Sequence, residues 1–147
     1  MIAKKITKHD DLKLALQIRT EVFVKEQGVP LEVEIDEFDK LNGGAAHVLI
    51  YQNDQAVGTG RILFMEEYGK LGRICILPSF RKFGLGKEIV KALEDIALEY
   101  GLEQVCLHGQ TQAEGFYRKL GYQTVSDEFL EEGIPHVLMV KKIIART

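Results

Sequence analysis

Arg81-Lys82-Phe83-Gly84-Leu85-Gly86 is the stretch of sequence that decides the fold. It lies between an apolar run that ends at Pro78 and a long amphipathic pattern that begins at about Leu85, so it predicts a glycine-rich turn from a strand into a helix. Such a turn leaves backbone N–H groups unpaired at the positive end of a helix dipole, where an anion can bind. Two interpretations stay open here: a phosphate cradle with added charge from Arg81, Lys82 and Lys87, or an ordinary turn whose glycines serve packing.

The bulk composition is that of an ordinary folded domain. Hydrophobic residues make up 46% and charged residues 28% of the 147 residues, and this length fits a single domain over residues 1–147. The net charge of -3 argues against a surface that binds nucleic acid. The sequence has no signal-type apolar run and no apolar segment of membrane-helix length, so we expect a cytoplasmic protein without a membrane partner.

The two cysteines, Cys75 and Cys106, each lie inside an apolar run of strand type. This placement is typical of reduced cysteines in a protein core. Neither has the Cys-x-x-Cys spacing of a redox or zinc site, and a disulfide would be unusual in a reducing compartment. We therefore expect both residues to serve packing and expect no metal site.

Hydrophobic periodicity along the rest of the chain predicts the element order βααβββαβαββ, a mixed sheet with helices on its faces. Asp10 and Asp11 are the expected N-caps of the first helix, and residues 127–134 are expected to form a loop. The expected elements are strands near residues 2–6, 46–51, 56–65, 71–77, 105–107, 122–125 and 136–143, and helices near 10–27, from Pro30, at 85–100 and at 112–120.

Residues 32–39 place five carboxylates in eight positions. One interpretation is a solvated face, which is the usual meaning of a run of like charges. The other is an acidic rim that attracts a cationic substrate. The sequence alone leaves both open.

A second signature follows the first at Ala113-Glu114-Gly115-Phe116-Tyr117-Arg118-Lys119-Leu120-Gly121-Tyr122. The pair resembles the GNAT acyltransferase superfamily, whose pyrophosphate loop reads Gln/Arg-x-x-Gly-x-Gly/Ala and whose later helix commonly reads Ala-x-x-Phe-Tyr-x-x-x-Gly-Phe/Tyr. The resemblance covers essentially the whole chain and extends to a small bacterial subgroup, distantly similar to amino-sugar-phosphate acetyltransferases. It implies the α/β (α+β) GNAT fold: a mixed, mostly antiparallel, twisted sheet of about six to seven strands with helices on both faces.

The resemblance also implies acetyl-CoA as cosubstrate. The amides of the glycine turn would hold its pyrophosphate, and the strand before the turn would pair with the pantetheine arm and polarise the thioester carbonyl through a backbone N–H. Gln110 stands where many members have Asn seven residues before the Tyr. The cofactor-binding positions implied are Ile74, Cys75, Ile76, Arg81, Lys82, Phe83, Gly84, Leu85, Gly86, Lys87, Gln110, Phe116, Tyr117 and Lys119.

The implied reaction is direct attack of a neutral primary amine on the thioester, with release of CoA thiolate. Tyr117 stands at the family's Tyr position and is expected to be the general acid for the thiolate; packing on the sheet is the alternative. The motifs supply no general base. Glu26, His108 and His136 are candidates, and a water chain could replace all three.

The acceptor is expected to be a small-molecule or peptidic amine. The acidic run favours a cationic amine such as lysine or a polyamine, whereas Arg19, Arg61 and Arg73 could form a basic pocket for a sugar phosphate. The acyl group could be acetyl or longer, and the resemblance allows a homodimer. A different class of function is also open: a regulatory module that binds acyl-CoA without turnover.

Overall fold

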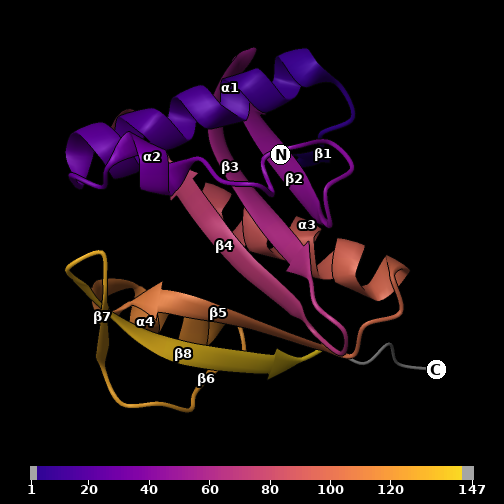
Figure 1. Ribbon diagram of the computed structural model, residues 1–147, viewed down its shortest axis with the longest axis vertical. Helices are drawn as coiled ribbons and strands as arrows, with labels where there is room; N and C mark the ends of the chain where they lie inside the picture. Colours follow the sequence, from indigo (N-terminus) through magenta and orange to yellow (C-terminus); the bar gives the residue numbers. More distant parts are fainter. Residues whose placement is uncertain (1–2, 144–147) are drawn as a thin grey trace.

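The computed structural model describes residues 3–143, and one twisted sheet of eight strands runs through this part of the chain (Figure 1). The strand order is β1-β2-β3-β4-β5-β8-β6, with β7 also paired to β8, and every pair in it is antiparallel except β4 with β5. Residue 2, expected in the first strand, lies outside the described range. The strands are β1 Lys4–Lys5, β2 Ala45–Gln52, β3 Gln55–Phe64, β4 Gly69–Ile76, β5 Gln104–Gln110, β6 Gln123–Thr124, β7 Phe129–Glu131 and β8 Ile134–Lys142.

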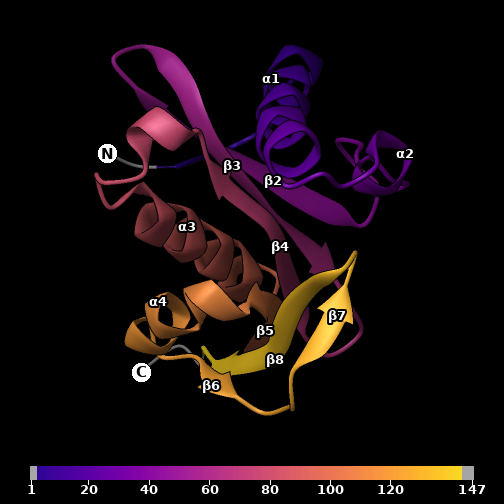
Figure 2. The same cartoon turned by 90° about the vertical axis from the view of Figure 1, so that its left-hand side faces the viewer.

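Helices cover both faces of the sheet, which confirms the predicted fold. Helix α1 lies on one face of β2, β3 and β4, and α3 lies on the other (Figures 1 and 2). Over residues 3–143, each helix is too short or too polar to cross a lipid bilayer. The helices are α1 His9–Arg19, the π-helical η1 Thr20–Glu26 that continues it, α2 Leu31–Glu34, the 3₁₀ turn η2 Pro78–Phe80, α3 Leu85–Glu99, the 3₁₀ turn η3 Thr111–Ala113 and α4 Glu114–Lys119.

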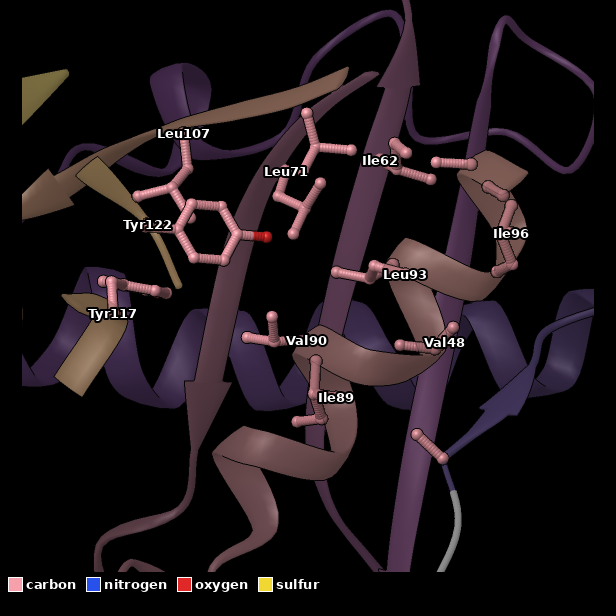
Figure 3. Close-up of a cluster of buried hydrophobic side chains, with 14 of the residues drawn as sticks. Val48, Ile62, Leu71, Ile89, Val90, Leu93, Ile96, Leu107, Tyr117 and Tyr122 are labelled. Atoms are coloured by element: carbon pink, nitrogen blue, oxygen red, sulfur yellow. The ribbon is translucent and has the colours of Figure 1, made fainter. Parts of the chain in front are cut away.

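The larger hydrophobic core lies between α3 and the sheet. Apolar residues recur along α3 at the spacing that places them on one helix face, and their side chains point at the strands (Figure 3). Full burial of such side chains stabilises the fold by about 1.5–3 kcal/mol each. The labelled core residues come from α3 (Ile89, Val90, Leu93, Ile96), from the strands (Val48, Ile62, Leu71, Leu107) and from α4 and the segment after it (Tyr117, Tyr122).

A smaller core forms under α1, where Leu12, Ala15 and Ile18 pack against Leu49 of β2 and Cys75 of β4. Burial of Cys75, and of Cys106 on β5, agrees with the expected packing role, and both thiols are free.

The predicted start of the first helix is wrong by one or two residues. Helix α1 begins at His9 after Lys8, without a side-chain cap, so Asp10 and Asp11 lie in its first turn. They complement the helix dipole there and do not cap the helix.

The predicted loop at residues 127–134 is partly wrong, because Phe129–Glu131 form strand β7 along the first residues of β8. Glu132 (φ 51°) and Gly133 (φ 73°) form the turn between the two strands. Two consecutive positive φ angles match the twist of a tight β-hairpin, and Gly133 adopts one without steric cost. The sheet therefore has eight strands, one more than the six to seven that were predicted.

Neither interpretation of the acidic run holds for three of its five carboxylates: Glu34, Asp36 and Asp39 pair with arginines, whereas Glu32 and Glu37 are exposed. Arg19 Nε lies 2.8 Å from Glu34 Oε2, and Arg19 Nη1 lies 2.6 Å from Asp39 Oδ1. The side chains of Glu34 and Asp39 are only 3% and 2% exposed. We call the whole group the charged cluster; its members are Arg19, Glu34, Asp36, Asp39, Arg61 and Arg73.

The charged cluster ties α1 and the segment around α2 to strands β3 and β4. Arg61 on β3 makes two bonds to Asp36, with Nη1–Oδ1 at 2.7 Å and Nη2–Oδ2 at 2.8 Å. Arg73 on β4 reaches Glu34 Oε2 through Nε at 3.0 Å. Three guanidinium groups therefore face three carboxylates, and the arginines form no basic pocket. Losing one partner of such a buried pair costs far more than the pair itself contributes.

We expect Arg19→Met to lower the free energy of unfolding by about 3–5 kcal/mol, because Glu34 and Asp39 would stay buried without their partner. The measurement is urea unfolding at neutral pH. Arg118→Met is the matched control, since Arg118 also pairs with a carboxylate but is 62% exposed; its effect should stay below about 1 kcal/mol. Equal losses in the two variants would contradict the structural role of the cluster.

The cluster also predicts a loss of stability in acid. Partial burial pushes the pKa of Asp36 up, but bonds from Arg61 and the Phe38 amide and the charge of Arg73 lower it to about 2. A carboxyl with a depressed folded pKa contributes stability above its unfolded pKa, and that contribution disappears as the pH falls through the folded pKa. Between pH 5 and pH 2, the unfolding free energy of the wild type should therefore fall about 2 kcal/mol more than that of Asp36→Asn. The exposed Asp127→Asn should follow the wild type; parallel curves for wild type and Asp36→Asn would refute this assignment.

Candidate active site

The candidate site is a cleft that opens where β4 and β5 separate. These strands pair at Gly69–Val105, Lys70–Cys106 and Leu71–Leu107 only, and then diverge toward α2 and β7 (Figure 1). The cavity between them has a volume of about 740 Å³ and is lined by both strands, by the end of η1 and by α4. Its size suits a small-molecule ligand.

A β-bulge shapes the β4 wall of the cleft. Thr59 pairs with Cys75 and Arg61 with Gly72, so Gly60 alone faces both Arg73 and Ile74. Arg73 has φ 54°, a left-handed conformation that is uncommon for a residue with a side chain. The bulge adds twist to β4 at the point where the strand leaves β5.

The peptide groups of Ile76 face the cleft. The Leu77 N–H donates to the Val57 carbonyl of β3 at 2.8 Å, and an antiparallel ladder alternates, so the groups of Ile76 point to the other edge of β4. At Ile76, β5 no longer pairs with that edge of β4. Arg81 Nε donates to the Ile76 carbonyl at 2.9 Å, in agreement with this direction. The Ile76 N–H is therefore a donor at an open strand edge.

The glycine turn ends at an uncapped helix N-terminus. Gly84 has φ 72° at the N-cap of α3, and no side chain caps the helix. Leu85 buries its side chain in the core, so it can offer a ligand only its N–H. Gly86 lies against the Phe116 ring of α4: a Cβ at Gly86 would lie 3.2 Å from Phe116 Cζ. The turn thus exposes amides beside α4, as an anion site requires.

Several expected cofactor residues lie around the cleft rather than in its wall. Lys82, Phe83 and Lys87 are exposed beside the turn, and Lys119 is exposed on α4. The cavity wall itself holds Ile74, Cys75, Ile76, Arg81, Gly86, Gln110, Phe116 and Tyr117 of the expected set.

Arg81 and Glu26, expected in separate roles, form one ion pair. Arg81 Nη1 lies 2.8 Å from Glu26 Oε2, and Nη2 lies 2.6 Å from Oε1. The hydrogen bonds from Arg81 lower the pKa of Glu26. A carboxylate held in this way is a weaker base, so the pairing counts against Glu26 as the proton acceptor.

Gln110 bridges the mouth of the cleft to Gln27 at the end of η1. Its Nε2 donates to Gln27 Oε1 at 2.9 Å, and Gln27 Nε2 donates back at 3.4 Å. The longer amide, in place of the family's Asn, therefore reaches the opposite wall.

Tyr117 lies in the cavity wall and is 9% exposed. Burial, followed by the nearby Cys75, raises the pKa of its hydroxyl to about 12. The phenol therefore keeps its proton at neutral pH and can serve as a hydrogen-bond donor.

His108 and His136 meet at Glu131, a residue that the sequence reasoning missed. His108 Nδ1 lies 2.7 Å from Glu131 Oε1, and His136 Nε2 lies 3.6 Å from Oε2. All three line the cavity. Partial burial pushes the pKa of Glu131 up, but the bond with His108 and the charges of His108, His136 and Lys70 bring it below its usual value. Only the Glu132-Gly133 turn signal could have indicated the hairpin that carries Glu131.

Two other chemistries have little support in the described part of the chain. Residues 3–143 contain no group of three or more His, Cys, Asp or Glu placed to hold a metal ion. Burial raises the pKa of the Cys75 thiol, so this cysteine in the cavity wall stays protonated and is a poor nucleophile.

The open α/β sheet, with an uncapped, glycine-led helix N-terminus beside its cleft, agrees with the acyltransferase fold that the two motifs implied. A family model described as an acetyltransferase (GNAT) domain matches residues 8–143. The chain therefore belongs to the GNAT acetyltransferase family, as its two motifs predicted. Enzymes of this family use acetyl-CoA and act on small amine acceptors.

The chain is also similar to individual proteins over nearly its whole length. YyaT, an uncharacterized protein of Bacillus subtilis (strain 168), is 55% identical over 143 residues, or 97% of each chain. YjcF, an uncharacterized N-acetyltransferase of the same organism, is 48% identical over 133 residues, which cover 90% of this chain and 93% of YjcF. The crystal structure of Escherichia coli ElaA matches with a TM-score of 0.84 at 28% identity, over 96% of this chain and 99% of ElaA.

Proposed function

We propose that this protein is an acetyl-CoA-dependent N-acetyltransferase that moves an acetyl group to a primary amine by direct attack in a ternary complex. One observation carries the proposal: a single cleft runs past Gly86 at the helix N-terminus, Ile76 on the open strand edge, Tyr117 and His108. These positions supply, in order, an anion site, a backbone donor, a proton donor and a basic side chain.

The pyrophosphate of acetyl-CoA would bind the amides at the start of α3. Gly84 gives the turn its left-handed φ, and the uncapped N–H groups of Leu85, Gly86 and Lys87 are at the positive end of a 15-residue helix. Arg81 is committed to Glu26 and to the Ile76 carbonyl, so its role is to hold the turn against β4. Lys82 and Lys87 would add charge from the surface.

The pantetheine arm would run along the open edge of β4, where its amides can pair with the strand as an added β-strand does. The thioester carbonyl would then accept a bond from a backbone N–H of β4, such as that of Ile76. A donor fixed in place before the reaction stabilises the tetrahedral oxyanion without reorganisation.

Tyr117 would donate its hydroxyl proton toward the departing sulfur. The raised pKa supports this role, because a deprotonated phenol would repel a thiolate. The protonated Cys75 thiol supports direct attack over an acyl-cysteine intermediate. Among the expected bases, the pairing of Glu26 with Arg81 leaves His108 and His136 better placed to accept a proton.

The acceptor would be a cationic amine rather than a sugar phosphate. Arg19, Arg61 and Arg73 would be needed to bind a phosphate, and each is paired with carboxylates of the charged cluster. Glu131 and Glu132 line the same end of the cavity and would attract an ammonium group.

The cofactor site is tested by a matched pair of glycine variants. Gly84 (φ 72°) precedes α3 and Gly101 (φ 78°) follows it, and an added Cβ would meet open space at both. Ala at either position should cost about 1–2 kcal/mol of stability, from backbone strain alone. Acetyl-CoA at about 100 times its Kd should stabilise the wild type and Gly101→Ala by roughly 2.7 kcal/mol, read as a rise in Tm. Gly84→Ala should lose most of that rise; the same rise in both variants would place the cofactor elsewhere.

The reaction is tested by thiol release from acetyl-CoA with spermidine, a lysine-containing peptide and glucosamine 6-phosphate as acceptors. We expect release with one of the two cationic amines and little with the sugar phosphate. Tyr117→Phe should lower kcat about 100-fold and keep the Tm rise with acetyl-CoA, whereas Tyr100→Phe, at an exposed tyrosine outside the cavity, should match the wild type. Binding of acetyl-CoA without thiol release for any amine would favour a regulatory acyl-CoA-binding module.

A further inference from the structure

The polar residues at the acceptor end of the cleft lie on one face of the strands β5, β8 and β7. Directly paired residues of a sheet point to the same face, as do residues two apart on one strand. The pairs His108–Leu138, Gln110–His136 and Phe129–His136 therefore put His108, Gln110, His136 and Phe129 on one face. Glu131, two residues after Phe129, shares it.

His108 occupies the position nearest the opening of the sheet. Leu107 is the last residue of β5 that pairs with β4, at Leu71, and His108 follows it directly. Its side chain is 29% exposed and lines the cavity, whereas the side chain of His136 is only 8% exposed. His108 can therefore touch a bound ligand, and His136 lies behind it.

The hydrogen bonds of the group fix which ring nitrogens are available. The Ile134 carbonyl can only accept, so His136 Nδ1, 2.7 Å away, carries a proton. Glu131 is held below its usual pKa and is ionised at neutral pH, so His108 Nδ1 donates to it at 2.7 Å. In the neutral His108 ring, Nε2 is then the basic nitrogen. Phe129 packs its ring edge-on to His108, at 5.1 Å between centroids, and limits how the imidazole can turn.

We propose that His108 is the general base of this site and that Glu131 is its positioning residue. The inference rests on the proposed function and deepens it. Glu131 orients the His108 ring, selects the tautomer with a free Nε2 and stabilises the imidazolium that forms when the ring takes a proton, which is the logic of a carboxylate–histidine pair.

The acceptor enters as an ammonium ion, which must lose two protons before the amide is complete. The bound ammonium gives one proton to His108 Nε2, and the imidazolium later releases it to solvent. The neutral nitrogen then forms the C–N bond at the thioester carbonyl carbon. As the C–S bond breaks, its electron pair leaves with the sulfur. Tyr117 gives its hydroxyl proton to the thiolate, and the second proton lost by the nitrogen returns to the tyrosinate through solvent. The products are an amide, CoA thiol and one proton in solution.

Other charged groups face this pair. Glu131 on β7 is shared with His136 of β8, and Lys70 of β4 lies close enough to lower the pKa of Glu131. Glu132 also lines the cavity. Replacing Glu131 by Gln keeps an oxygen that can accept from His108 Nδ1 and removes the negative charge that would stabilise the imidazolium.

The test uses acetyl-CoA and whichever of spermidine or the lysine-containing peptide gives the faster thiol release. At pH 7, His108→Gln should lower kcat/KM at least 100-fold and keep the Tm rise with acetyl-CoA. Its rate should climb about tenfold per pH unit from pH 7 to 9, because only the amine that is already neutral can then react. Glu131→Gln should lower kcat/KM about tenfold, because the His108 ring is then held less firmly with Nε2 free. Glu128→Gln, an exposed carboxylate outside the cavity, is the control and should match the wild type.

A measurement without turnover accompanies the kinetics. Nitrogen NMR of the neutral His108 ring should show the proton on Nδ1 in the wild type and a larger share of the Nε2–H tautomer in Glu131→Gln. This measurement tests the role of Glu131 even if His108→Gln does not fold. A wild-type rate in His108→Gln, or an unchanged His108 tautomer in Glu131→Gln, overturns the inference while the acetyltransferase function stands. A wild-type protein that releases thiol with none of the amines rejects the function itself, and the base assignment with it.

Discussion

The candidate site depends on the early end of pairing between β4 and β5. The two strands are joined by three residue pairs, and the bulge at Arg73 and Ile74 turns β4 away from its neighbour. An open strand edge is a liability on a protein surface because its N–H and C=O groups can pair with another chain. Here the open edge lies inside a cleft, where a chain with amides of its own can satisfy those groups.

The charged cluster links this bulge to the helical wall of the cleft. Arg73 adopts a positive φ that costs about 1–3 kcal/mol, and its guanidinium bonds Glu34 of α2. Arg19 of α1 bonds the same carboxylate oxygen, Glu34 Oε2. Replacing such a network with apolar residues could leave stability unchanged, so its value here is geometric. It fixes α2 at the rim of the cleft and uses the arginines that could otherwise bind a phosphate.

Local patterns predicted the features that local chemistry determines. The turn into α3, the helix itself and its end at Gly101 follow from glycine positions and a 3.6-residue period, and the structure has them all. The charged cluster could not be predicted in this way, because each carboxylate meets an arginine 15 to 39 residues distant. Strand β7 was not predicted from the sequence, because it has only three residues and no apolar alternation. Its Leu130 is exposed. Glu131 was missed with it, so the two histidines were predicted without the carboxylate that joins them.

Strand β5 separates the two proton-transfer groups of the proposed reaction. Leu107 and Gly109 face the α3 side of the sheet, and a Cβ at Gly109 would lie 3.4 Å from Tyr117 Cδ2, so the Tyr117 ring packs directly on the strand there. His108, between them, must face the opposite side. A thioester held in the opening would then meet a base on one face and a hydroxyl donor on the other. In the proposed reaction the amine would lose protons on the side where it attacks, and the sulfur would gain one on the side where it leaves. The alternation of β5 thus sets the candidate proton acceptor and the candidate proton donor on opposite sides of the opening.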